Sequence, residues 1–124
     1  RCRFDLRLEP GVVMYHEWRD DSSPYRVGPS IWFRGGKLFV GGKELAVLPL
    51  EEWIHVEVAA TLGEQSTGTW DLTVTLPGEA PRRFEKLNNG SADWKKLTWL
   101  GIISNATEST VFYLDNLKLE NKDL

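Results

Sequence analysis

The residues with the clearest capacity for chemistry form one dense group of aromatic and charged side chains near the N-terminus. The run from Tyr15 to Asp20 reads YHEWRD, and a second aromatic and basic group follows between residues 25 and 34. Sugar recognition needs flat aromatic faces for C–H contacts and fixed planar donors and acceptors that pair with hydroxyl groups. We therefore predict a ligand-binding surface made of Tyr15, His16, Glu17, Trp18, Arg19, Tyr25, Arg26, Trp32 and Arg34.

Which of these side chains act together depends on the strand that carries them. Residues Val12 to Asp20 read as an extended run in which even-numbered and odd-numbered residues point to opposite sides, and either side could be the inner one. If the odd-numbered residues face outward, Trp32 and Arg34 could lie beside them. The alternative is that the tryptophans belong to the core and that the charged residues form ordinary cross-strand ion pairs on a solvated face.

The strongest strand signal lies in the middle of the chain. Residues 54–60 and 70–76 both alternate strictly between apolar and polar residues, with a polar loop between them, so they predict a β-hairpin near the centre of a sheet. The N-terminal run, residues 1–8, alternates in the same way and predicts a strand with one buried face.

Turn residues divide the rest of the chain into further short strands. Gly35-Gly36 and Gly41-Gly42 flank the run KLFV and predict two successive tight hairpins. Pro29 bars the early part of the strand over residues 27–34 from a central ladder position. Further strands are predicted at 43–48, at 82–87, at 97–103 with burial on both sides or a covered outer face, and at 109–120 with a bulge at Asp115-Asn116.

About eight to ten short strands with turn signals between them, together with six tryptophans, are typical of an antiparallel β-sandwich. We therefore predict an all-β, jelly-roll-like sandwich. A chain of 124 residues is expected to form one domain with a core of its own. Because the sequence begins at Arg1, inside a strand pattern, we expect it to be a piece of a longer polypeptide.

Composition argues against several classes of partner. The net charge of −3, with acidic and basic residues mixed along the chain, provides no basic stripe for nucleic acid. No apolar run is long enough to cross a bilayer, so we expect no membrane partner. The single Cys2 alternates with Phe4 and Leu6, which predicts a buried, inert thiol.

Two phrases carry a family likeness: EWIHVEV at residues 52–58 and VFYLDNLKL at residues 111–119. They resemble strands of concanavalin A-like and laminin G-like jelly-roll modules. The resemblance implies glycan binding, often in accessory domains of secreted bacterial carbohydrate-active proteins, and so an extracellular or cell-surface location. Such modules are usually longer at the N-terminus, so the resemblance also implies that the first strands are missing here or replaced. It requires no cofactor, although Asp115 matches an aspartate that holds a structural calcium in several relatives; the alternative is a side chain bonded to its own backbone at a bulge.

Three functions follow as hypotheses. The first is a non-catalytic module that binds a polysaccharide or glycan. The second is a structural sandwich that packs against a neighbouring catalytic domain of the parent protein and exposes an apolar patch when isolated. The third is a polysaccharide lyase or glycoside hydrolase. The sequence favours a non-enzyme, because the paired carboxylates of a laminarinase-type strand are absent and Glu57 stands alone among apolar residues.

Overall fold

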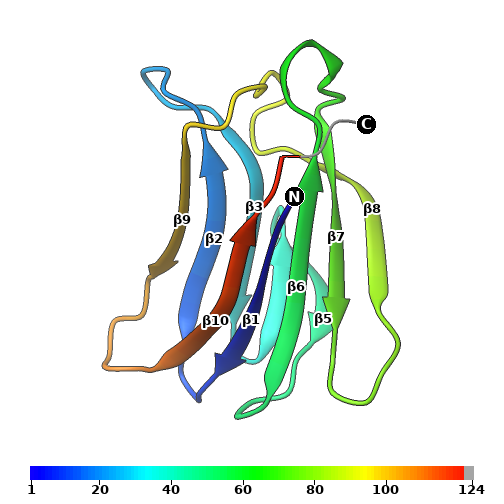
Figure 1. The fold of residues 1–124 in the computed structure, drawn as a ribbon. Helices are drawn as coiled ribbons and strands as arrows, with labels where there is room; N and C mark the ends of the chain where they lie inside the picture. Colours follow the sequence, from blue (N-terminus) through cyan, green and yellow to red (C-terminus); the bar gives the residue numbers. More distant parts are fainter. Residues whose placement is uncertain (122–124) are drawn as a thin grey trace.

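The computed structural model describes residues 1–121 and consists of ten strands in two antiparallel sheets that face each other (Figure 1). Sheet A has the order β10-β1-β6-β7-β8, and sheet B has the order β5-β4-β3-β2-β9. The predicted β-sandwich is therefore confirmed. The strands are β1 (Cys2–Leu8), β2 (Val13–Arg19), β3 (Val27–Arg34), β4 (Lys37–Val40), β5 (Lys43–Val47), β6 (Trp53–Ala60), β7 (Thr69–Thr75), β8 (Arg82–Asn88), β9 (Trp99–Ser104) and β10 (Phe112–Leu119).

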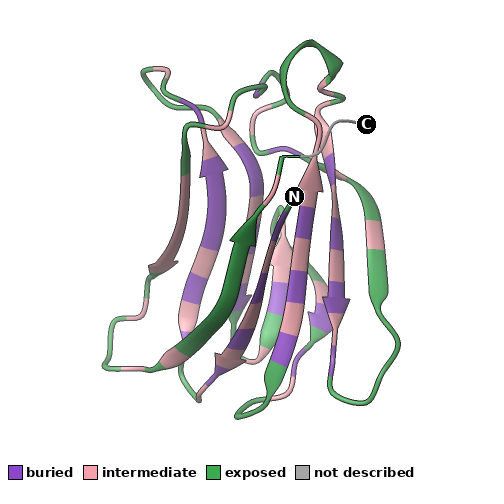
Figure 2. Ribbon diagram, viewed as in Figure 1, coloured by how far each residue is buried: buried purple, intermediate pink, exposed green. Residues whose placement is uncertain are grey.

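Alternating side chains from both sheets fill the space between them. Inward-facing residues of β1, β6 and β7 are almost fully buried, whereas their outward neighbours are partly exposed, so these strands are striped in Figure 2. Cys2 is one of the buried residues, as predicted, and burial raises the pKa of its thiol to about 11. No helix among the described residues is long and apolar enough to span a membrane.

The predicted central hairpin and meander are both present. The β6–β7 hairpin lies inside sheet A, and β3, β4 and β5 are joined by two tight turns at Gly35-Gly36 and Gly41-Gly42. All four of these glycines have positive φ, which suits the two-residue turns of hairpins. In β10 the predicted bulge occurs at Asn116, which has a φ of 53°, where the pairing with β1 shifts register.

The first half of β3 has only one strand partner. It pairs with β2 along its length, but β4 joins it only from Trp32 onward, so Pro29 lies where no second strand requires its missing N–H. The loop after β8 covers this stretch instead. Ser91 donates its backbone N–H to the Val27 carbonyl at 2.7 Å, and the Trp94 indole packs directly on Gly28.

One sequence expectation for β9 is wrong. The apolar run was expected to be buried on both sides or to have a covered outer face, but β9 is an edge strand whose residues are half-buried or exposed. The Trp99 indole lies over Gly101 and covers part of the outer face of β9.

We expect Gly28→Ala to destabilise the fold by about 1 to 3 kcal/mol, because a Cβ at this position would lie 2.5 Å from the Trp94 ring and the core would be overpacked. Urea denaturation measures the loss. In a Trp94→Leu background the same substitution should cost less than half as much. An equal cost in both backgrounds would mean that Trp94 is not the source of the strain.

Candidate functional site

The alternation of β2 decides which side chains reach solvent. Met14, His16 and Trp18 point into the core. Tyr15, Glu17 and Arg19 point outward from sheet B, but Glu17 is covered by its neighbours and only 9% exposed. The question that the sequence left open is thus answered in favour of the odd-numbered residues. Trp32 lies beside them, because it is directly opposite Tyr15 in the β2–β3 ladder.

Tyr15 and Trp32 form the first half of this outer surface. Their ring centroids are 4.6 Å apart and their planes meet at 21°, so the rings are stacked across the two strands. Such a pair restricts the rotamers of both side chains and keeps their rings in place. Both residues are half-buried, which leaves part of each ring in solvent.

Arg19 organises the second half. Its Nε donates to Glu17 Oε2 at 2.6 Å, and the other carboxylate oxygen of Glu17 accepts a hydrogen bond from the Ser30 hydroxyl at 2.9 Å. Partial burial alone would lower the pKa of Arg19, but the hydrogen bond and the negative charge of Glu17 outweigh it and raise that pKa. The guanidinium is therefore held in a fixed orientation while it stays charged.

Two aromatic rings enclose the same guanidinium. Arg19 Cζ lies 4.2 Å from the centroid of the Tyr25 ring and 4.1 Å from that of the Trp99 ring, which are cation–π distances. Trp99 is 38% exposed and Tyr25 is 50% exposed. The Trp99 ring occupies the space that a side chain at position 101 would need, since a Cβ on Gly101 would lie 2.2 Å from it.

The two remaining arginines lie at opposite ends of β3. Arg26 is paired with Asp20 and Asp93, with shortest N–O distances of 3.7 and 3.2 Å. Arg34 stacks on Phe39 with Cζ 4.7 Å from the ring centroid. The structure therefore brings Tyr15, Glu17, Arg19, Tyr25 and Trp32 into one surface, and places Arg26 and Arg34 at its two ends. We call this surface, together with Ser30 and Trp99, the sheet B platform.

The inclusion of His16 and Trp18 in the binding surface is corrected by the structure. Both side chains are buried in the core, on the opposite side of β2 from the sheet B platform. Trp18 Nε1 donates to His16 Nε2 at 2.9 Å, so the proton of the neutral imidazole is on Nδ1, which is 3.0 Å from the Gly101 carbonyl oxygen. Burial lowers the pKa of His16 to about 4, and the bond to Gly101 only partly opposes it.

Sequence reasoning missed three contributors to the sheet B platform, namely Ser30, Trp99 and Gly101. Trp99 and Gly101 reach it because β9 pairs with β2, placing Trp99 opposite Arg19 and Gly101 opposite Glu17. These partners are about eighty positions apart in the chain. No local pattern indicates such a pairing, although the alternation of Trp99 with Leu100 does indicate that the two differ in face.

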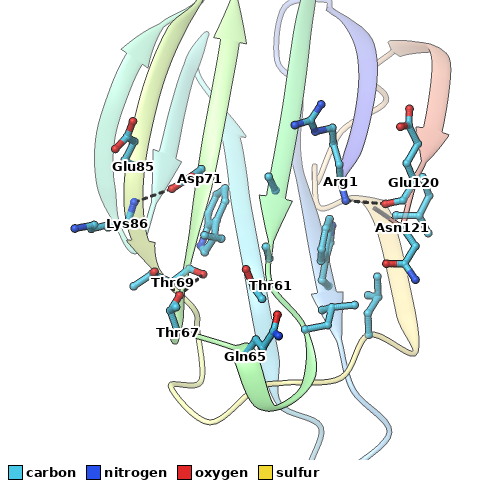
Figure 3. A pocket seen from close by; sticks show the side chains of 17 residues that line it. Arg1, Thr61, Gln65, Thr67, Thr69, Asp71, Glu85, Lys86, Glu120 and Asn121 are labelled. Atoms are coloured by element: carbon cyan, nitrogen blue, oxygen red, sulfur yellow. Dashed lines mark hydrogen bonds between the residues drawn. The ribbon is translucent and has the colours of Figure 1, made fainter. Parts of the chain in front are cut away.

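A hollow of about 910 Å³ lies at one end of the sandwich (Figure 3). Its interior is apolar, with Trp18, Trp70, Leu97 and Leu119 among the lining residues. Part of its polar rim is bonded to itself: the Lys86 backbone N–H donates to Asp71 at 3.0 Å, and the Thr67 and Thr69 hydroxyls are 2.9 Å apart. Because both tryptophans are almost wholly buried, the hollow exposes little aromatic surface, and the sheet B platform is the better candidate for a sugar.

Asp115 lies at the bulge of β10, exposed to solvent. Its Oδ1 accepts a hydrogen bond from the Asn116 backbone N–H at 2.8 Å, which is the alternative role considered for it. Within residues 1–121, no group of three His, Cys, Asp or Glu side chains is arranged to hold a metal ion. Calcium binding at Asp115 stays a prediction.

No protein-family model, no curated protein and no solved structure matches this chain. The site is therefore interpreted from its own chemistry.

The buried His16 predicts a loss of stability in mild acid. The unfolded chain binds a proton at this histidine near pH 6.5, but the folded chain does so only near pH 4, so the unfolded state holds more protons between these values. The free energy of unfolding should fall by about 3 kcal/mol as the pH decreases from 6.5 to 4. Urea denaturation at several pH values measures the fall.

His55 provides the internal comparison. Burial would lower its pKa, but hydrogen bonds to Asp5 at 2.7 Å and Glu57 at 3.1 Å outweigh it and raise the pKa, so its stabilising effect is lost only above pH 6.5. In His16→Gln the loss of stability between pH 6.5 and 4 should largely disappear. A His16 resonance that titrates near pH 6.5 in the folded protein would contradict the assignment.

Proposed function

We propose that this chain is a non-catalytic glycan-binding module whose ligand contacts the sheet B platform. The observation that carries the proposal is the immobilised group around Arg19, in which the guanidinium is bonded to Glu17 and enclosed by Tyr25 and Trp99. Next to it lies the Tyr15–Trp32 stack. Aromatic faces and a fixed planar donor on one surface suit the C–H faces and hydroxyl groups of a sugar.

The rigidity of the surface supports binding rather than a packing role for these side chains. Ordering a long side chain such as arginine on binding costs conformational entropy, and Arg19 is already ordered by three neighbours. Its Nε–H is used by Glu17 and a further hydrogen bond goes to the Tyr15 side chain, which leaves the other guanidinium N–H donors for a ligand hydroxyl group. The platform is therefore preorganised for a neutral, hydroxyl-rich ligand.

The likeness to concanavalin A-like and laminin G-like modules belongs to this proposal. A two-sheet antiparallel sandwich is compatible with a jelly roll, and the two phrases that carry the likeness lie on β6 and β10. On this proposal the protein acts as an extracellular accessory module of a bacterial carbohydrate-active protein, with any calcium held at Asp115. The phrases lie outside the sheet B platform, so they support the fold and not the choice of ligand.

One observation favours a second candidate, a sandwich that packs against a neighbouring part of its parent protein. Several leucines on the inward face of β10 are exposed, which is the apolar patch that this hypothesis expects. The two roles use different surfaces and do not exclude each other.

We expect Trp99→Ala and Trp32→Ala each to weaken binding to the recognised polysaccharide by about tenfold, since each removes one aromatic contact worth on the order of 1 kcal/mol. The measurement is affinity electrophoresis against a panel of plant, algal and host polysaccharides, followed by calorimetric titration of any hit. Tryptophan fluorescence should change on binding in the unsubstituted protein.

Trp53→Ala is the matched control, because Trp53 is similarly exposed, at 43%, but belongs to β6 in sheet A. It should leave affinity unchanged. Gly101→Ala should weaken binding as Trp99→Ala does, by displacing the Trp99 ring without removing it. Absence of binding to every polysaccharide, or equal losses from Trp53 and Trp99, would contradict the proposal.

A further inference from the structure

From Leu114 onward the inward face of β10 is exposed, unlike the inward faces of β1, β6 and β7; only Phe112, at the start of β10, packs on the core. Leu114 and Leu119 are opposite Leu6 and Cys2 of β1 and so point into the sandwich. Leu6 and Cys2 are fully buried, whereas Leu114 is 38%, Leu117 is 51% and Leu119 is 57% exposed. Figure 2 shows β10 as almost entirely exposed beside the striped β1. The apolar interior of the sandwich is therefore open on this flank.

The backbone of β10 also has an unpaired edge. Glu120 exchanges backbone hydrogen bonds with Arg1, and the Val111 carbonyl accepts from Glu9, so these two residues direct their backbone groups toward β1. Alternation along an antiparallel strand then directs the N–H and C=O of Leu114 and Leu119 away from β1. Within residues 1–121 no strand pairs with them, because β10 is the last strand of sheet A.

The space on this flank suits a single strand. In Figure 1 the edge strand β9 of sheet B lies further out than β10, so a strand added beside β10 would lie over the inner face of β9. Leu100 and Ile102, opposite the buried Trp18 and His16, face that position and are only half-buried.

The charged residues on the outward face of β10 have no residue of opposite charge directly across from them on β1. Asp115 is opposite Asp5, and Lys118 is opposite Arg3, so like charges face each other in the ladder. Glu120 bonds Arg3 and lies 3.3 Å from Lys118, but Asp115 forms no ion pair within the described chain. A strand on the other side of β10 can therefore supply a cation for Asp115, and an anion opposite Lys118 would add to the pair that Lys118 forms with Glu120.

We propose that the β10 edge binds one extended strand from outside these 124 residues, which joins sheet A antiparallel to β10. Its alternate residues are apolar and cover Leu114, Leu117 and Leu119, while its outward residues are acidic opposite Lys118 and basic opposite Asp115. This is β-strand addition, in which backbone hydrogen bonds provide affinity and alternate side chains provide specificity. The inference is independent of the glycan proposal, because β10 lies in the other sheet from the sheet B platform.

The test uses two synthetic peptides, Val-Glu-Val-Lys-Val-Thr-Val and its charge-exchanged form Val-Lys-Val-Glu-Val-Thr-Val, each with a Gly-Ser tail for solubility. Amide NMR titration of the 124-residue chain should show binding of the first peptide, with slowed hydrogen exchange at Leu114 and Leu119. The charge-exchanged peptide should bind about fivefold more weakly, since it places like charges opposite Asp115 and Lys118. In the double variant Asp115→Lys/Lys118→Glu the preference should reverse.

Two further variants distinguish binding at the β10 edge from nonspecific binding of the peptide to exposed apolar residues. Leu114→Asp should weaken binding of the first peptide at least about tenfold, because it places a charge in the apolar groove. Val47→Asp, at an exposed apolar position on the edge strand β5 of sheet B, should not. The proposal is overturned if neither peptide protects the β10 amides, if both bind equally to the unsubstituted chain, or if sedimentation shows a dimer that protects those amides without peptide. Polysaccharide binding would be unaffected by any of these outcomes.

Discussion

The alternation of β2 is the constraint on which both the core and the candidate site depend. One face of this strand supplies the Trp18–His16 hydrogen bond to the interior, and the other face supplies Arg19 to the sheet B platform. Gly101 on β9 serves both sides at once. Its carbonyl oxygen lies 3.0 Å from His16 Nδ1, and its lack of a side chain leaves room for the Trp99 ring. Protonation of His16 would occur at Nε2 and break the hydrogen bond from Trp18, while the Nδ1 bond to the Gly101 carbonyl would stay, so its cost falls on the core and not on the strand pair that positions Trp99.

Much of the fold could be predicted because its signals are local. Strict alternation indicated β1, β6 and β7, paired glycines indicated the meander of β3, β4 and β5, and the Asp-Asn pair indicated the bulge in β10. Each of these features depends on residues within a few positions of one another. The prediction that Pro29 has a strand partner on one side only could also be derived locally. Proline has no backbone N–H, so it cannot donate to a second neighbouring strand at any place in a sheet.

The candidate site could be predicted only in part, because its geometry depends on partners distant in sequence. Both faces of β2 contain aromatic and polar residues, so hydrophobicity alone did not identify the inner one. The Trp18 indole N–H donates a hydrogen bond to His16 inside the core. Because these polar atoms are paired, the face of β2 that contains them can be buried. Trp99 belongs to the site because β9 pairs with β2. Nothing in the sequence of β9 indicates that β2 is its partner strand.

The two flanks of the sandwich are protected to very different degrees. On one flank the edge strand β8 exposes Arg82, Arg83 and Glu85, and the Lys86 N–H is bonded to Asp71 at an irregular position of the ladder. Charges and irregular pairing are the usual means by which a sheet edge resists further strands. On the other flank β10 also has a bulge and the outward charges Asp115 and Lys118, but its inward leucines are exposed, which sets it apart from β8. Exposed leucines on the inward face of an edge strand suit a surface that is covered in the working protein, and one more strand on sheet A would bury them.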